Sequence, residues 1–269
     1  EIWFDYRKDL VLTWRESSGW KRRFYGALTL WSDDISPGAL AVDERIGRAI
    51  TVIGIPSAFL LHGYVGFIFG SVKANPWWST PLMPIVFLFS AIVSGIALVL
   101  VLYMALTWIR RVPMDMRCID TIATYLFYMF IIDFSLEMLD LIHRLYEADE
   151  SLRALDFMVK TRLFMSQIVV QIVLGTLLPI ALLALVQVKK IPAGWRQGIY
   201  ATTGLLTLVG IFAMRWNVVI GGQLFSKSFL GYTTYKMGFA TSEGLLPAIL
   251  VMILPFVICL AWSGCASDH

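Results

Sequence analysis

Six predominantly apolar stretches, each about 20 residues or longer, constrain the fold of this chain more than any other feature. They cover approximately residues 46–72, 81–108, 119–145, 162–188, 197–217 and 244–262. About 20 apolar helical residues cross a hydrocarbon core of about 30 Å, and backbone inside lipid must satisfy its own hydrogen bonds. The alternating pattern of a membrane β-barrel is not visible in the sequence. We therefore predict an all-α, polytopic transmembrane helical bundle with about six helices.

Composition supports this class and excludes others. The chain of 269 residues is 58% hydrophobic and carries a net charge of +3, whereas a soluble domain is about 45–50% apolar. The basic residues cluster at helix ends, so we expect no nucleic-acid partner. Cys118, Cys259 and Cys265 have no CxxC spacing, and we expect no metal or haem in this chain. The sequence also contains no nucleotide-binding loop and no Ser–His–Asp arrangement.

Residues 1–45 differ from the rest because aromatic and basic side chains alternate there. We interpret this segment as an amphipathic interfacial lead-in or loop, followed by the transmembrane helical domain 46–269. Ser36-Pro37 and Asp43-Glu44 indicate where the first clear helix begins. Basic residues of the lead-in and of the 109–118 and 189–196 turns lie on one side, which predicts a cytoplasmic lead-in. The loops at Pro76-Trp77-Trp78 and Gly221–Glu243 then face outward.

Four ionisable residues share one face of the third apolar stretch. Asp133, Glu137, Asp140 and Arg144 follow the spacing i, i+4, i+7 and i+11. Such a row is too costly to face lipid, so it should face the bundle interior or a water-filled cavity. Carboxyl groups in this setting can exchange protons near neutral pH, which suggests a proton path or the acidic wall of a redox site. The alternative is a mutually paired network near the helix end, in which Arg144 neutralises one acid.

Other polar residues within the apolar stretches are candidates for a site. His62 and Tyr64 carry groups that can hydrogen bond to quinone oxygens, although His62 could simply bond to a neighbouring helix. A bis-histidine haem formed by His62 and His143 is a weaker alternative. Arg215 either snorkels to the interface or pairs with the acids. Two glutamines one turn apart, Gln167 and Gln171, either join helices or line the same cavity.

Two sets of segments resemble a known family. His62-Gly-Tyr-Val-Gly-Phe, Pro76-Trp-Trp-Ser-Thr-Pro-Leu-Met-Pro84 and Phe89-Ser-Ala-Ile-Val-Ser-Gly95 resemble the NrfD/PsrC family of polysulfide reductase-type, quinone-interacting membrane subunits. Arg215-Trp-Asn-Val-Val-Ile-Gly-Gly222 resembles its longer members, and most of all the DsrP type of the Dsr sulfite-reduction-associated membrane complex. HybB-type subunits of membrane-bound hydrogenases are more distant.

The resemblance implies a function in the cytoplasmic membrane of a prokaryote, in anaerobic respiration or sulfur metabolism. A menaquinone or other quinone is expected near the outer face, exchanging electrons with an extracytoplasmic, ferredoxin-like iron–sulfur subunit. Iron–sulfur clusters and haems are expected in partners only, including a multihaem cytochrome and other membrane redox subunits. The resemblance makes His62 and Tyr64 candidate quinone contacts, and Trp77 and Arg215 site-lining or docking residues. The chain would be a membrane subunit of an oxidoreductase complex, surrounded by membrane lipid, and we assign it no catalytic residue.

Two departures from the family pattern affect this interpretation. Family members have eight to ten helices, so we expect further helices before residue 1. Gln171 stands where some relatives carry a glutamate, which makes the row on the third stretch the better candidate for a proton path. Two other functions stay open: an ion-coupled transporter or channel using the buried acids, and a structural anchor without quinone chemistry.

Overall fold

The structure is a computed structural model that describes residues 4, 6–75, 77–147, 151–189, 191–224, 238–239 and 244–266. In those residues the regular secondary structure is entirely helical. The helices are α2 (Arg7–Glu16), α3 (Gly19–Leu28), α4 (Pro37–Gly70), α5 (Met83–Ile109), α6 (Met116–Glu147), α7 (Ser151–Thr161), the π-helix η1 (Phe164–Leu177), α8 (Leu178–Val188), α9 (Ala193–Gln223) and α10 (Leu245–Ala266).

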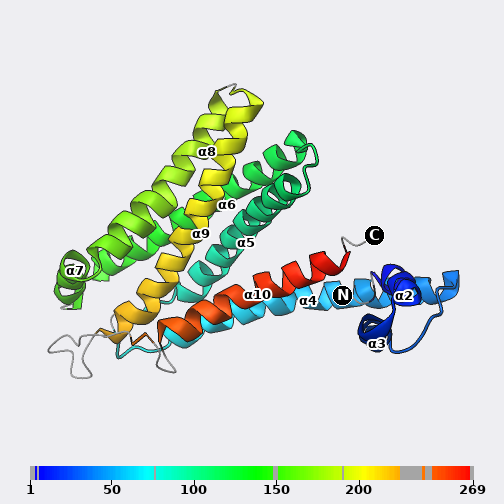
Figure 1. Cartoon of the computed structure of the whole chain (residues 1–269). Helices are drawn as coiled ribbons and strands as arrows, with labels where there is room; N and C mark the ends of the chain where they lie inside the picture. The colour runs from blue at the N-terminus through cyan, green and yellow to red at the C-terminus, as the bar shows by residue number, and fades with distance from the viewer. Residues whose placement is uncertain are drawn as a thin grey trace.

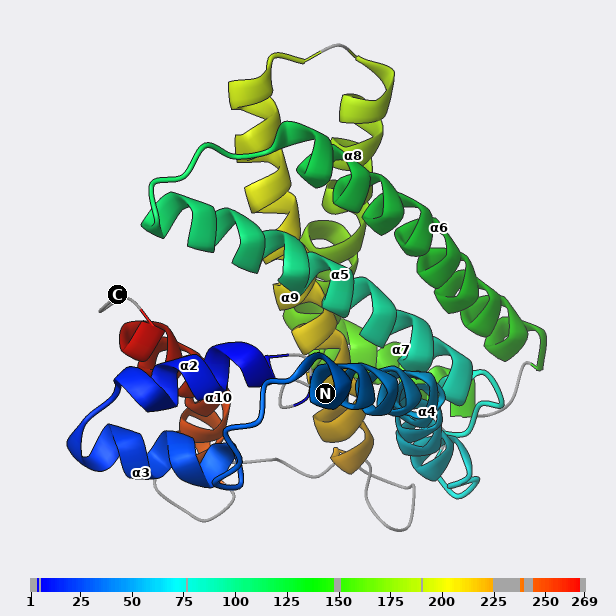
Figure 2. The same ribbon diagram turned by 90° about the vertical axis from the view of Figure 1, so that its right-hand side faces the viewer.

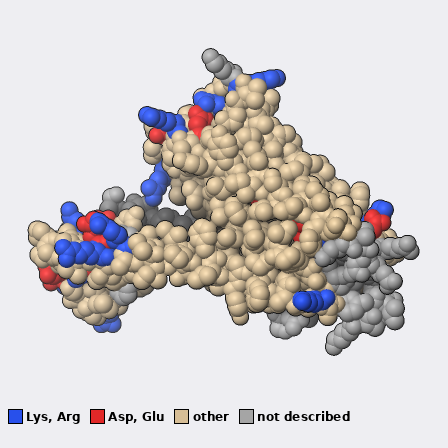
Figure 3. All heavy atoms as spheres, turned by 180° about the vertical axis from the view of Figure 1, so that it is seen from behind, with Lys and Arg blue, Asp and Glu red and all other residues tan. Residues whose placement is uncertain are grey.

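Five of these segments are long and apolar enough to cross a membrane. They are Pro37–Gly70, Met83–Ile109, Met116–Tyr146, Phe164–Val188 and Ala193–Gln223. The sixth predicted stretch corresponds to α10, in which Leu245–Ile258 forms a shorter apolar helix. The predicted all-α polytopic class is therefore confirmed. Charged side chains gather toward the extremities of the molecule, with a broad uncharged region between them (Figure 3), as expected for a protein in lipid.

A bundle of α5, α6, η1 with α8, and α9 forms the body of the molecule (Figures 1 and 2). Its core is apolar, and the buried residues repeat at alternating intervals of three and four, which keeps them on one face of each helix. On α5 these residues are Val86, Ser90, Val93, Ala97, Leu100 and Met104, and on α6 they are Ile119, Ala123, Leu126 and Phe130. α9 crosses η1 closely, because a Cβ on Gly175 would lie 2.3 Å from the Cα of Gly210.

Helix α4 packs against α5 near its C-terminal end and projects away from the bundle (Figure 1). It begins at Pro37, at the Ser36-Pro37 signal and before the apolar stretch that starts near residue 46, because the Ser36 hydroxyl accepts a hydrogen bond from the Ala39 amide and Pro37 suits the first turn. Helices α2 and α3 occupy the predicted lead-in. Arg7 ties them to α4 by donating to both Asp43 carboxylate oxygens at 3.0 Å. The division into 1–45 and 46–269 stays a prediction.

Candidate functional site

A cavity of about 550 Å³ opens between the helices at one end of the bundle. We call it the polar cavity. The end of the bundle where it lies carries the 71–82 loop, α7 and the C-terminus of α9, and we call this end the cavity end. Its walls come from the loop, α5, α6, α7, η1 and α9. The polar lining residues are Trp77, Glu137, Asp140, Arg144, Asp156, Gln167, Gln171 and Asn217, and the apolar ones include Met83, Val86, Ile168, Ile172, Met214 and Val218.

The ionisable row on α6 faces this space. Glu137, Asp140 and Arg144 line the cavity, and Asp133 lies deeper, only 3% exposed. These residues continue the spacing of the apolar core residues that precede them, from Ile119 to Phe130. α6 thus changes from an apolar to a polar core face at Asp133, and the structure turns the whole row toward the bundle.

Asp140 is the most fully paired acid of the cavity. The Thr80 hydroxyl donates a hydrogen bond to one carboxylate oxygen, and the Arg144 Nε donates to the other at 2.9 Å. Arg144 also donates from Nη2 to the Trp77 carbonyl oxygen at 3.2 Å. These bonds join the 71–82 loop to α6 at the cavity mouth. The paired network considered from the sequence is therefore present for Asp140 and Arg144.

The two tryptophans of the loop are fastened to α9. The Trp77 Nε1 donates to the Asn217 carbonyl at 3.0 Å, and the Trp78 Nε1 donates to the Val218 carbonyl at 2.6 Å. Buried Asn75 donates to the Gly222 carbonyl at 2.8 Å and accepts from the Trp77 amide. Trp77 consequently bridges α6 and α9 across one wall of the cavity.

A second set of polar contacts joins η1 to α9. The Asn217 Nδ2 donates to the Gln171 Oε1 at 2.9 Å, and both side chains line the cavity together with Glu137. Three buried oxygens near the cavity have no hydrogen-bond partner in the described part of the chain: Asp133 Oδ1, Gln167 Oε1 and Asn217 Oδ1. The lining of the cavity therefore includes carboxylate and amide side chains that can accept hydrogen bonds.

Arg215 does not line the cavity but lies beside its deep end. Its guanidinium group is 5.3 Å from the centre of the Phe87 ring, and Nη2 contacts the Ser90 hydroxyl at 3.4 Å. It also interacts electrostatically with Asp133. The pairing of Arg215 with the acids, considered from the sequence, stays a prediction.

His62 and Tyr64 lie on α4, away from the residues that line the cavity. The His62 Nδ1 is 2.9 Å from the Ala58 carbonyl of its own helix, and Tyr64 is 62% exposed. In this structure neither meets Trp77 or the α6 acids around one cavity. Their assignment as quinone contacts stays a prediction.

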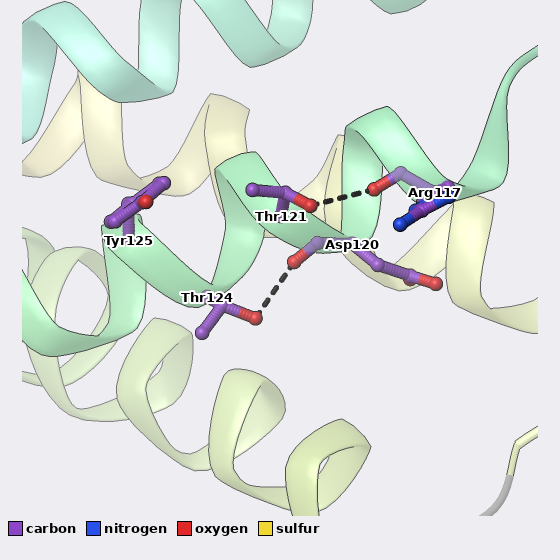
Figure 4. A pocket seen from close by; sticks show the side chains of 5 residues that line it. All are labelled: Arg117, Asp120, Thr121, Thr124 and Tyr125. Atoms are coloured by element: carbon purple, nitrogen blue, oxygen red, sulfur yellow. Dashed lines mark hydrogen bonds between the residues drawn. The ribbon is translucent and has the colours of Figure 1, made fainter.

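Sequence reasoning missed a polar cluster at the opposite end of the bundle. Asp120 of α6 accepts hydrogen bonds from Arg196 Nη1 at 2.6 Å and from the Tyr200 hydroxyl at 2.9 Å, both on α9. Beside it is an open hollow of about 480 Å³, lined by Arg117, Asp120, Thr121, Thr124 and Tyr125 (Figure 4). The available sequence signal was Asp120 near the start of the third apolar stretch and Arg196 just before the fifth.

In the part of the chain that is described, no group of three or more His, Cys, Asp or Glu side chains could hold a metal ion. Cys118 is a free thiol, and the side chains of Cys259 and Cys265 lie outside the described residues.

Fold and site together define a polytopic membrane protein whose helices enclose a polar cavity at one end. The chain belongs to the NrfD family: the family model described as "Polysulphide reductase, NrfD" matches residues 19–227. The resemblance found in the sequence is thereby confirmed at the level of the family, and the DsrP type within it stays a prediction.

Two relatives show what the chain is similar to. It is 29% identical over 227 residues to a selenate reductase subunit of Mesobacillus selenatarsenatis, a match that covers 82% of this chain and 51% of that protein. It is 36% identical over 62 residues to Protein NrfD of Escherichia coli K12, covering 23% of this chain and 20% of that protein. The chain thus spans about half the length of the selenate reductase protein.

Proposed function

We propose that this chain is a quinone-interacting membrane subunit of an oxidoreductase complex, and that the polar cavity is its quinone site. The observation that carries the proposal is the cavity itself, where acids, amides and an indole converge on about 550 Å³ between membrane-crossing helices. Small-molecule sites have volumes of about 300–1,000 Å³, with apolar walls and a few polar groups that fix orientation. Membership of the family, and similarity to a protein named as part of a selenate reductase, are consistent with a redox complex.

The lining suits the two parts of a quinone. Met83, Val86, Ile172 and Met214 offer apolar surface for a ring and tail, and the amide side chains of Gln167, Gln171 and Asn217 are among the lining groups that can hydrogen bond to a head group. When bound, a quinone supplies the exchange of two electrons and two protons. The residues of this chain would orient it, exclude water and hold protons.

Asp133, Glu137 and Asp140, with Arg144, form the proposed proton path. Asp140 and Arg144 lie at the mouth with Thr80, Glu137 lines the cavity, and Asp133 is buried at its deep end. Residues seven apart on a helix differ by about 10 Å along its axis, so Asp133 and Asp140 reach different depths. This arrangement supports proton exchange between the cavity and its own end of the bundle, and coupling to translocation is part of the proposal.

The proposed electron partner is an extracytoplasmic, ferredoxin-like iron–sulfur subunit that docks at the cavity end, with a multihaem cytochrome and other membrane redox subunits nearby. The 71–82 loop, pinned to α6 and α9, offers a firm surface there. We further propose that the quinone is menaquinone, that the membrane is the cytoplasmic membrane of a prokaryote, and that the lead-in faces the cytoplasm.

The test uses the purified complex, adding a quinol analogue and following reduction of the iron–sulfur centres of the partner. We expect Trp77→Leu and Asp140→Asn to slow this reduction by about tenfold or more, since each removes a group that lines the site. Trp108→Leu is the matched control, because Trp108 is 79% exposed at the other end of α5. His62→Ala and Tyr64→Phe test the predicted contacts on α4.

Two outcomes would overturn the proposal. Native complex that shows no quinol-dependent reduction would favour the structural anchor or the transporter, and movement of ions would then be measured with the α6 acids replaced. Equal rates for Trp77→Leu, Asp140→Asn and Trp108→Leu in assembled complexes would exclude this cavity as the quinone site.

A further inference from the structure

The open hollow of about 480 Å³ at the end of the bundle opposite the polar cavity has no part in the proposed quinone site or proton path. Its lining comes from one face of α6, since the five residues follow the spacing i, i+3, i+4, i+7 and i+8. They are, in order along the helix, Arg117, Asp120, Thr121, Thr124 and Tyr125 (Figure 4). Eight helical residues advance by about 12 Å, so the lining changes from charged to hydroxyl-bearing to aromatic with depth.

Arg117 gives the hollow a positive charge that the protein does not cancel. The acid beside it, Asp120, is already paired, because its Oδ2 accepts from Arg196 Nη1 at 2.6 Å and its Oδ1 from the Tyr200 hydroxyl at 2.9 Å. Arg117 is exposed, and its guanidinium group forms no ion pair or hydrogen bond with the described residues. Its N–H groups are therefore available to an external anion, and their planar arrangement matches the oxygens of a phosphate.

The threonines supply hydrogen-bond acceptors next to this cation. The Thr121 hydroxyl donates to the Arg117 carbonyl at 2.8 Å, and the Thr124 hydroxyl donates to the Asp120 carbonyl at 2.7 Å (Figure 4). Because its hydrogen is used in this way, the Thr121 oxygen offers a ligand lone pairs only. The Thr124 oxygen already accepts from the Gln187 Nε2 at 2.9 Å. The hollow thus suits a ligand that carries both an anionic group and a hydroxyl donor.

This end of the bundle has the features of a membrane–water interface. The membrane-crossing segments of α5 and α8 end here, and those of α6 and α9 begin here. Trp108, Tyr125 and Trp195 are 79%, 60% and 75% exposed, as expected for aromatic side chains at the level of lipid headgroups. Residues 109–120 and 188–197 contain six Lys or Arg and two Asp. Such a basic surface attracts anionic headgroups.

The face of α6 that lines the hollow continues as an apolar surface. Tyr128, Ile131 and Ile132 follow Tyr125 on the same side of the helix, and they are 57%, 42% and 39% exposed. Polar groups at the helix start and apolar groups toward the membrane centre are the order in which a phospholipid presents its headgroup and its acyl chains. A soluble phosphate compound would leave the apolar part of this face unused.

We propose that the hollow binds the headgroup of an anionic phospholipid that carries hydroxyl groups, as phosphatidylglycerol does. Arg117 donates to the phosphate, and the glycerol hydroxyls of the headgroup donate to the Thr121 oxygen and to the Asp120 carboxylate. The acyl chains lie along the face that continues from Tyr128 to Ile132. This lipid site is separate from the polar cavity and does not depend on the proposed quinone function.

The experiment titrates the intact, delipidated complex with phosphatidylglycerol, and with phosphatidylethanolamine of the same acyl chains, and counts bound lipid by native mass spectrometry. We expect native complex to bind phosphatidylglycerol more tightly. Arg117→Gln should weaken that binding about tenfold, since it removes a charge-assisted contact. Thr121→Val should weaken it about fivefold through the loss of one neutral hydrogen bond. Both side chains are exposed, so the variants should assemble.

Arg110→Gln is the matched control. Arg110 is an exposed arginine at the same end that does not line the hollow, and its replacement should leave the affinity for phosphatidylglycerol unchanged. Equal losses for Arg117→Gln and Arg110→Gln would show a diffuse attraction in place of a site and would overturn the proposal. So would equal binding of the two lipids that Arg117→Gln does not alter. Soluble glycerophosphoglycerol bound as tightly as phosphatidylglycerol would overturn the assignment to a lipid.

Discussion

Replacing Gly222 with alanine should displace the Trp78 indole from α9. A Cβ on Gly222 would lie 2.1 Å from Trp78 Cε2 and 2.2 Å from its Nε1, far inside contact distance, so the rigid ring must move. The move breaks the bond to the Val218 carbonyl and the edge-on contact with Phe69 at 5.2 Å. We expect the free energy of unfolding to fall by about 1 kcal/mol for the lost hydrogen bond, by about 1 kcal/mol for the lost aromatic contact and by about 2 kcal/mol for crowding. Because alanine has a better helix propensity than glycine, about 1 kcal/mol is regained, so the net loss of stability is about 3 kcal/mol.

Gly198→Ala is the control, because a Cβ added to Gly198, on the same helix, would meet no atom within 4 Å. It should be neutral or slightly stabilising. Thermal unfolding in detergent, followed by size-exclusion chromatography of the protein that stays monodisperse, compares the two variants. If Gly222→Ala unfolds at the same temperature as Gly198→Ala, the Trp78 ring does not lie on Gly222 and the described anchoring of the loop is wrong.

Two further predictions concern ion pairs. Arg7→Met leaves Asp43, only 3% exposed, without its cation, and should destabilise the packing of α2 and α3 on α4 by about 3 kcal/mol. Limited proteolysis between α3 and α4 should therefore become faster. The control Arg48→Met, which breaks an exposed ion pair, should leave the rate of proteolysis unchanged. Asp120→Asn removes the charge that Arg196 pairs with and should lower the free energy of unfolding by about 1–2 kcal/mol, because the site is only partly exposed. Asp156→Asn, which breaks an exposed ion pair, is the comparison. If Asp120→Asn lowers the melting temperature no more than Asp156→Asn does, the prediction is wrong.

The positions of the membrane-crossing helices could be predicted from the sequence because their signal is local. The length and hydrophobicity of an apolar stretch indicate by themselves that it crosses a membrane, whatever the helix later packs against. The spacing of Asp133, Glu137, Asp140 and Arg144 also predicts that their side chains share one face of α6, since helical geometry fixes that face. The Ser36-Pro37 pair indicates where α4 begins, although the polar first turns around Asp43 hide the boundary from a hydropathy reading.

Other features depend on partners distant in the chain and could not be predicted. Nothing in Phe164–Leu177 signals a π-helix, and Gln171 of this helix bonds to Asn217, 46 residues away in the chain. The bond between Asn75 and Gly222 spans 147 residues. The family resemblance made His62 and Trp77 candidates for one site; the structure puts Trp77 against α9 and His62 on the projecting α4, and the assignment of His62 stays a prediction.

Two of the segments that carry the family resemblance, Pro76–Pro84 and Arg215–Gly222, are in contact with each other. Trp77 and Trp78 belong to one, and Asn217 and Gly222 belong to the other, and each tryptophan donates to a carbonyl of the second segment. Glycine at 222 leaves the space that the Trp78 ring fills. A side chain larger than glycine at 222 would therefore meet the Trp78 ring, which couples the two segments at this position.

Function in this chain is indicated where a helix departs from its own pattern. The core face of α6 is apolar from Ile119 to Phe130, and at the next core position it has Asp133, which remains buried with one oxygen unpartnered in the described structure. An apolar residue there would stabilise the bundle, because a buried carboxyl group without a donor is costly. Such a residue persists when it contributes something other than stability. The same reasoning applies to Asn217 on α9, and both residues are consistent with the proposed ligand cavity at this end.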